Sequence, residues 1–242
     1  MKDLHSHILF GVDDGSKTLE ESISILKRLN SSGVTDIILT PHYIKSSNYT
    51  TNNKEKEKKF QELKNKLKEA KIDINIYLGN EVFFTDAFLE LLEREEIKTL
   101  NNSRYLLFEF PVGQVSKYTS EVISNIIANG YIPILAHPER YPRFQEHPQV
   151  IEEYLRMGVL LQGNYLSLYG KYGNKAKKTL KILLRKKQIS FLGSDIHHEE
   201  KINIKKLINK IESLTKDKEY NQKILVENFD KVINNLDIGI LR

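Results

Sequence analysis

The chain has 242 residues, with 37 lysines and arginines against 32 aspartates and glutamates, 40% hydrophobic residues and no cysteine. The absence of cysteine excludes disulfides, thiolate metal sites and any enzyme whose nucleophile is a cysteine. A net charge of +5 is too small for a dedicated nucleic-acid binder. No stretch approaches the roughly 20 apolar residues that span a bilayer, so we expect a cytoplasmic protein without stable membrane insertion.

Short apolar runs bounded by turn residues predict seven buried strands. They lie at 3–5, 36–39, 74–78, 104–110, 132–136, 159–163 and 189–193. Helical patterns lie at 18–30, 53–70, 86–94, 116–128, 149–156, 175–187, 201–214 and 221–234. Alternation of strand and helix is typical of right-handed βαβ units around a parallel sheet or barrel. No linker interrupts the series, so we predict one α/β domain over residues 1–242.

Histidines and carboxylates gather just after the predicted strands. Five of the seven histidines do so, and four carboxylates join them at equivalent positions. The set is His5, His7, Asp14, His42, Glu81, Glu109, His137, Asp195 and His197. In a barrel of βα units the C-terminal strand ends meet at one rim, where active sites are built. Imidazole and carboxylate are ligands of Mn²⁺, Fe²⁺ and Zn²⁺, so the set predicts a centre of two or three metal ions.

Each of these residues also has a purely structural interpretation. A single histidine after a strand is usually a hydrogen-bonded structural residue, but nine ionisable groups at one rim cost stability unless cations neutralise the carboxylates. His147 and His198 are expected on the surface. The lysine-rich run at 171–187 is expected to be a solvated helix face, with a grip on an acidic partner segment as the alternative.

Six motifs in the right order resemble one known family. They are "DLHSHILFGVDDGS", "TPHY", "GNE", "FEFP", "LAHPERY" and "GSDIH". Together they resemble the polymerase and histidinol phosphatase (PHP) superfamily, and within it the bacterial PHP-type protein-tyrosine phosphatases encoded with capsule and exopolysaccharide synthesis genes. The likeness runs from about residue 1 to 235, and the six motifs together make it specific.

The resemblance implies a distorted (β/α)₇ TIM-like barrel with a trinuclear centre. Manganese is the expected metal, with Fe, Zn, Mg or Co as alternatives. One ion would be held by His5, His7, Glu81 and Asp195. Glu81 would also reach a second ion, held by Glu109 and His137 as well. Asp14, His42 and His197 would hold the third ion. Arg140 matches the family's phosphate-binding arginine. Close relatives often carry a second arginine in the loop after "SDIH", where this chain has Lys201 instead. Whether a second residue contacts the phosphate therefore stays open.

The residues restrict the mechanism of phosphate ester hydrolysis. Without cysteine or a "DxDx[TV]" motif, water must attack directly, and a metal-activated hydroxide is the natural nucleophile. Arg140 would clamp the phosphate, and His42 or His197 would assist the leaving group. Asp3 and Asp13 are candidates to orient ligand imidazoles, with a turn role as the equal alternative.

The leading hypothesis is a protein-tyrosine phosphatase, a metal-dependent phosphoric monoester hydrolase that dephosphorylates a cognate bacterial tyrosine kinase controlling capsular polysaccharide synthesis. A small-molecule phosphatase, such as a histidinol-phosphate phosphatase, is the alternative with the same metals. A nucleic-acid-processing module and a non-catalytic metal-binding module are the alternatives from other classes. The general acid and the oligomeric state stay open.

Overall fold

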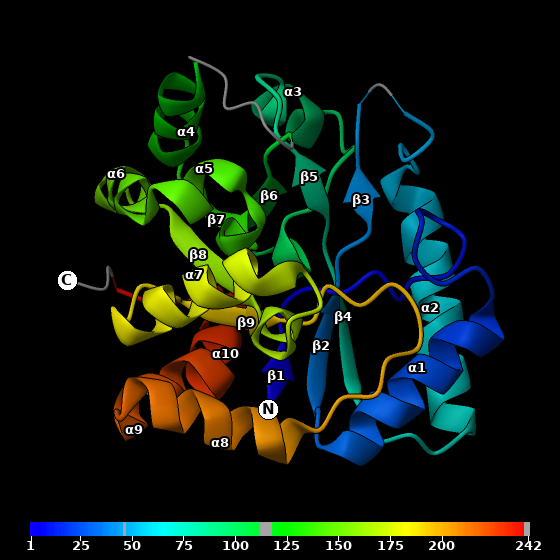
Figure 1. The fold of residues 1–242 in the computed structure, drawn as a ribbon. Helices are drawn as coiled ribbons and strands as arrows, with labels where there is room; N and C mark the ends of the chain where they lie inside the picture. The colour runs from blue at the N-terminus through cyan, green and yellow to red at the C-terminus, as the bar shows by residue number, and fades with distance from the viewer. Residues whose placement is uncertain (46, 112–117, 240–242) are drawn as a thin grey trace.

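The computed structural model describes residues 1–45, 47–111 and 118–239, and the strands of these residues pair in parallel (Figure 1). The strands are β1 (Lys2–Asp3), β2 (Asp36–Leu39), β3 (His42–Tyr43), β4 (Asn75–Leu78), β5 (Glu81–Phe83), β6 (Tyr105–Glu109), β7 (Ile132–Ala136), β8 (Leu160–Asn164) and β9 (Phe191–Gly193). One sheet has the order β1-β2-β4 and the other β3-β5-β6-β7-β8-β9.

The two sheets form one distorted barrel. β3 begins after a gap of two residues beyond β2, and β5 begins after the same gap beyond β4, so each pair continues one strand position. At the other edge the Leu4 amide donates to the Leu192 carbonyl at 3.1 Å, and Ser6 bridges Ile196 in parallel. The strands therefore occupy seven positions, which confirms the predicted fold class.

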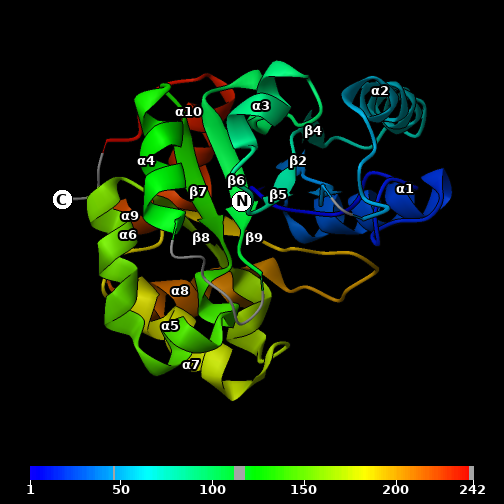
Figure 2. The ribbon, with the colours of Figure 1, turned by 90° about the horizontal axis from the view of Figure 1, so that it is seen from above.

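Helices surround the strands, with α1 and α2 at one side and α4 and α6 at the opposite side (Figure 2). The α-helices are α1 (Leu19–Ser32), α2 (Asn53–Glu69), α3 (Phe88–Glu93), α4 (Thr119–Ala128), α5 (Pro142–Glu146), α6 (Ile151–Met157), α7 (Gly173–Arg185), α8 (Ile204–Thr215), α9 (Lys218–Gln222) and α10 (Asn228–Ile233). In the described part of the chain none of them is long and apolar enough to cross a membrane.

Two predicted helices differ from the observed ones, and one observed helix was not predicted. The helix predicted at 221–234 is divided between α9, a π-helical turn at Lys223–Glu227 and α10. The helix predicted at 116–128 has its first two residues outside the described part, and α4 covers the rest from Thr119. The helix α5 was not predicted, because five residues are too few to show a helical period.

Alternation along β6 explains how a strand aims a polar side chain into the barrel. Tyr105 and Leu107 belong to the core inside the strands, whereas Leu106 and Phe108 belong to the core under the helices. Because side chains alternate between the two faces of a strand, Glu109 shares the inner face with Leu107. The last residue of the strand therefore lies at the mouth of the barrel.

One buried amide joins the two strand breaks. The side chain of Asn80 donates to the Pro41 carbonyl at 2.8 Å and accepts from the Lys98 amide at 2.9 Å. Pro41 precedes His42 and Asn80 precedes Glu81. This hydrogen bond thus holds the starting points of β3 and β5 in register just before two predicted ligands.

A buried lysine supports the same amide. Lys56 on α2 is 1% exposed, and its Nζ donates to Oδ1 of Asn80 at 2.6 Å and to the Glu96 carbonyl at 3.3 Å. Burial, and then the nearby Lys98, lower the pKa of Lys56 from 10.5 to about 7. Between these values the unfolded chain binds a proton that the folded chain does not, so the free energy of unfolding rises with pH in this window.

We therefore expect replacement of Lys56 by methionine to remove this rise. We would measure the free energy of unfolding of both proteins by urea titration at pH 7 and at pH 9.5. Between these pH values the value for the wild type should increase by about 2 to 3 kcal/mol more than the value for Lys56→Met. Lys64→Met, at an exposed position of the same helix, should follow the wild type. Parallel pH profiles of the wild type and Lys56→Met would contradict the prediction.

Candidate metal centre

All nine predicted ligands lie together at the rim formed by the C-terminal strand ends. Each has an atom 3.5 Å or less from a ligating atom of another member of the set. They come from the segment after β1, the loop before α1, the starts of β3 and β5, the end of β6 and the segments after β7 and β9. Residues from both ends of the chain thus share one site, and metal binding by them stays a prediction.

The innermost group consists of His5, His7, Glu81 and Asp195, all of them buried. The Nε2 atoms of the two histidines are 3.0 Å apart, and each lies 3.3 Å from Oε2 of Glu81. Oδ1 of Asp195 lies 3.6 Å and 3.3 Å from the same two nitrogens. Atoms that ligate one ion at about 2.1 Å lie roughly 3.0 to 3.5 Å apart, so the donor set fits a divalent cation.

Glu81 is shared with a second group. Its Oε1 lies 2.9 Å from Nε2 of His137, and its Oε2 lies 3.0 Å from Nδ1 of His42. Oε1 of Glu109 lies 3.3 Å from the same His42 nitrogen. Although His42 Nδ1 and Glu81 Oε2 are buried and close, neither has a hydrogen-bond partner among the described residues. A cation between them would satisfy both atoms, and the two oxygens of Glu81 are placed to serve two ions.

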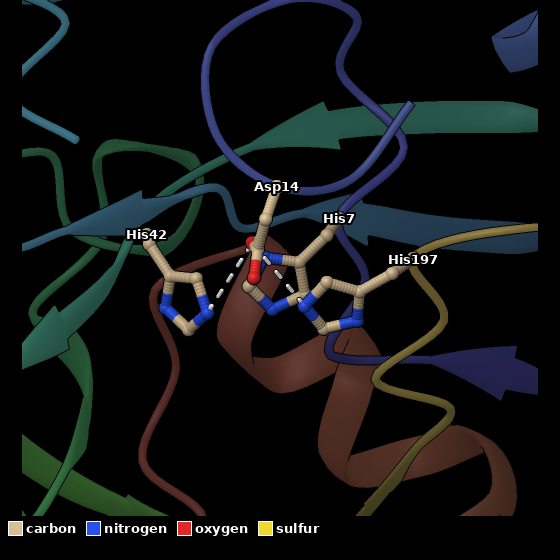
Figure 3. Close-up of side chains that lie close together, drawn as sticks. All are labelled: His7, Asp14, His42 and His197. Atoms are coloured by element: carbon tan, nitrogen blue, oxygen red, sulfur yellow. Dashed lines mark ion pairs between the residues drawn. The ribbon is translucent and has the colours of Figure 1, made fainter. Parts of the chain in front are cut away.

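The outermost group contains Asp14, His42 and His197, together with His7 (Figure 3). Oδ1 of Asp14 lies 3.5 Å from Nε2 of His197 and 3.8 Å from Nε2 of His42. The side chain of Asp14 is 46% exposed and that of His197 is 26% exposed. This group therefore faces the solvent, and His42 connects it to Glu81 through its other nitrogen.

The electrostatics of the cluster demand positive charge among the carboxylates. Burial lowers the pKa of His5, but Glu81 and Asp195 outweigh it and raise the pKa above its ordinary value. Burial raises the pKa of Glu81, yet His5 and His42 hold it well below the ordinary range. For Glu109, burial and then repulsion by Glu81 raise the pKa to about 7. Cations at this position would stabilise both carboxylates in their ionised form.

The two adjacent aspartates of the first loop take different places. Asp14 lies in the cluster, whereas Oδ2 of Asp13 lies 2.7 Å from Nδ1 of His7 and accepts from the His42 amide at 2.9 Å. Gly15 is required beside them, since a Cβ there would lie 1.8 Å from the carbonyl oxygen of His7. Asp13 therefore orients the His7 ring from behind and leaves Nε2 free for a metal.

We expect Asp13→Asn to weaken metal binding rather than abolish it. The negative charge of Asp13 fixes the orientation of the His7 ring and makes its Nε2 a better ligand for a metal, and an amide lacks this charge. The affinity for Mn²⁺ should therefore fall about 10- to 100-fold in a competition titration with a chelating dye. Asp73→Asn, at an exposed position, is the control with the same change of charge. Equal affinities of the two variants would argue against this role of Asp13.

Other supporting residues were not predicted. Oε1 of Gln162 lies 2.9 Å from Nδ1 of His5, and Nδ2 of Asn164 donates to Oδ2 of Asp195 at 3.2 Å. Both amides lie on β8, and a polar residue inside the apolar run "VLLQG" was a usable signal. Asp3 accepts hydrogen bonds from the amides of His5 and Ser194 and from the Tyr165 hydroxyl, so it holds the backbone and not an imidazole.

Two of the predicted ligands have a left-handed backbone. The φ angle is 34° at His137 and 52° at Asp195, and such conformations cost of order 1–3 kcal/mol each in residues other than glycine. The His137 amide donates to the Gln162 carbonyl at 2.8 Å, and the Asp195 amide donates to the His5 carbonyl at 2.9 Å. The neighbouring strands thus impose the conformation that aims both side chains into the cluster.

Arg140 lies at the edge of the cluster, in a helical turn at Pro138–Arg140. Its guanidinium donates to Oδ2 of Asp195 and lies 4.6 Å from the centre of the Tyr172 ring. The side chain is 34% exposed, so part of it is accessible to a ligand. Its predicted contact with phosphate stays a prediction, as does any such role of the exposed Lys201.

The two remaining histidines are on the surface, as expected. His147 is exposed, and the 61% exposed side chain of His198 has its Nδ1 3.2 Å from Oε1 of Glu21. Neither takes part in the three groups above. Five of seven histidines therefore serve the cluster.

A family model described as "Capsular polysaccharide synthesis, CpsB/CapC" matches residues 1–234. The chain belongs to the CpsB/CapC family. The CapC protein of Staphylococcus aureus is 38% identical over 197 residues, covering 81% of this chain and 77% of that protein. The tyrosine-protein phosphatase CpsB of Streptococcus pneumoniae is 36% identical over 203 residues, covering 82% and 83%.

Solved structures agree with this membership. The chain superposes with a TM-score of 0.87 and 25% identity on a structure described as YwqE from Bacillus subtilis and CpsB from Streptococcus pneumoniae, metal-dependent tyrosine phosphatases. The match covers 99% of this chain and 96% of that one. A histidinol phosphate phosphatase from Lactococcus lactis, at 19% identity and a TM-score of 0.59, shares the fold. The CpsB/CapC family thus uses the same barrel as other hydrolases.

Proposed function

We propose that this protein is a manganese-dependent protein-tyrosine phosphatase. The observation that carries the proposal is the cluster around Glu81, in which one buried carboxylate contacts four imidazoles within 3.3 Å. The names of the CpsB relatives support phosphotyrosine as the substrate. The nine predicted ligands fit two to three ions in the groups described above, with Glu81 shared between two of them.

The bound ions would supply a water of lowered pKa and neutralise charge on the phosphoryl oxygens. Arg140, already fixed by the Tyr172 ring, turns its open edge to the phosphate and adds a planar clamp. His197 lies on the solvent side of the cluster, so it would hold a proton for the departing tyrosine oxygen in a site that binds only the two inner ions. His42 directs both of its nitrogens at carboxylates of the cluster and would act as a ligand alone. A phenolate leaving group, with a pKa of about 10, needs only modest help.

We propose a bacterial tyrosine kinase that controls capsular or exopolysaccharide synthesis as the protein substrate. The description of the family model places related chains in capsule synthesis. The outer, solvent-facing position of Asp14 and His197 supports a substrate that approaches from the surface, as a tyrosine on a protein must.

Activity and metal content of the purified protein test the proposal together. The protein should hydrolyse a phosphotyrosine peptide, lose this activity with a chelator and regain it most fully with Mn²⁺. Histidinol phosphate should be a poor substrate, and a DNA duplex with Mn²⁺ should stay intact. A clear preference for histidinol phosphate would favour the small-molecule alternative, and full activity in the metal-free protein would overturn the metal centre.

A further inference from the structure

Four lysines gather where α7 packs against α8. Lys177 and Lys181 lie one turn apart on α7, and Lys206 and Lys210 lie one turn apart on α8. We call these four residues the lysine cluster. The two helices that carry them pack against each other. In agreement with this packing, burial lowers the pKa of Lys210 and the other three lysines lower it further.

The lysine cluster differs from helix surfaces on which a lysine faces an acid, such as Lys66 with Glu69 and Lys223 with Glu219. Among the residues that the structure describes, none of the four cluster lysines forms an ion pair with a carboxylate. Like charges one helical turn apart repel each other, so the cluster is costly by itself and is relieved by an anionic partner.

The cluster is connected to the rim of the metal centre through the turn before α7. Nζ of Lys210 donates to the Leu168 carbonyl at 2.6 Å and lies 5.4 Å from the centre of the Tyr169 ring. Three residues later, Tyr172 packs on Arg140. Since α7 begins directly after Tyr172, Lys177 and Lys181 follow within about 6 and 12 Å along the helix.

We propose that the lysine cluster is a docking surface for an acidic segment of the phosphoprotein substrate. The inference rests on the proposed phosphatase function and adds a second contact to it. A narrow double row of lysines that leads away from Arg140 suits an extended acidic chain, which covers 12 Å in about four residues. A membrane surface fits the cluster less well than an acidic peptide. Among the described residues, Tyr169 is the one large exposed hydrophobic side chain in contact with the cluster, and a single such side chain is too little for insertion into a membrane.

Two matched phosphotyrosine peptides test the proposal, one extended by about six glutamates after a short spacer and one by the same number of glutamines. For the wild type, the glutamate extension should lower KM about tenfold at low salt, with kcat unchanged. In the triple variant Lys177→Glu, Lys181→Glu, Lys206→Glu this preference should vanish. Hydrolysis of p-nitrophenyl phosphate should be equal in both proteins, since it needs no docking.

A triple variant of α2, in which the exposed Lys58, Lys64 and Lys68 become glutamate, controls for net charge and should retain the preference. Equal loss in both triple variants, or no preference in the wild type, would overturn the docking surface. Binding of the wild type to phosphatidylglycerol vesicles without any preference for the acidic peptide would also overturn it. If no peptide is hydrolysed, the phosphatase proposal fails, and fluorescence anisotropy of a labelled, unphosphorylated acidic peptide still tests docking.

Discussion

The Glu81→Gln variant should lose bound metal and at least about a thousandfold in kcat on a phosphotyrosine peptide. The substitution keeps the size of the side chain, but it replaces a charged acceptor by an amide whose nitrogen is a poor metal ligand. Oε2 of Glu81 contacts His5, His7 and His42, and Oε1 contacts His137, so two of the three groups are damaged together. Metal analysis after gel filtration and steady-state kinetics measure the two effects.

Glu90→Gln is the matched control, because Glu90 is an exposed carboxylate of α3 paired with Arg94. It should keep its metal content and activity. Thermal unfolding of the chelated proteins shows whether Glu81→Gln remains folded. A folded Glu81→Gln protein with full metal content and full activity would overturn the whole arrangement of ligands.

The Arg140→Lys variant should lose about a hundredfold in kcat/KM while its metal content stays unchanged. Lysine preserves the positive charge, but it lacks the planar fork that binds two oxygens at once and that stacks on the Tyr172 ring. The predicted loss therefore isolates the geometry of the phosphate contact from its charge. Two measurements test it: steady-state kinetics with a phosphotyrosine peptide, and inhibition of that reaction by free phosphate. The affinities of the enzyme for the peptide and for phosphate should both fall.

Arg140 also donates to Asp195, a predicted ligand, so its replacement acts on the metal site as well as on the phosphate contact. Parallel metal analysis separates the two. Arg143→Lys, on the exposed side of α5, is the control and should behave as the wild type. If Arg140→Lys loses metal in proportion to activity, the arginine acts through Asp195 and not on the phosphate.

The positions of most ligands could be predicted because they lie at or just after the end of an apolar run. Apolar runs locate strand ends, and parallel strands carry their ends to one rim, so His42, Glu81 and His137 were brought together by topology alone. Asp13 and Asp14 are adjacent in the chain, and they differ in the structure because Asp13 contacts Nδ1 of His7 and the His42 amide, whereas Asp14 faces Nε2 of His197. The supports Gln162 and Asn164 were missed because the contact of a buried amide with a particular ligand depends on packing, although Gln162 inside an apolar run was a usable signal.

The sequence by itself determined the parallel βα architecture and the nine ionisable residues, because apolar periodicity and strand ends are local features of the chain. Only the tertiary structure decided that His42 faces two groups through its two nitrogens, that Glu109 lies nearer to His42 than to His137, and that α7 packs against α8. These outcomes depend on the distances between segments that are far apart in the chain. Packing and hydrogen bonds, such as those of Asn80, set these distances, and local propensity does not.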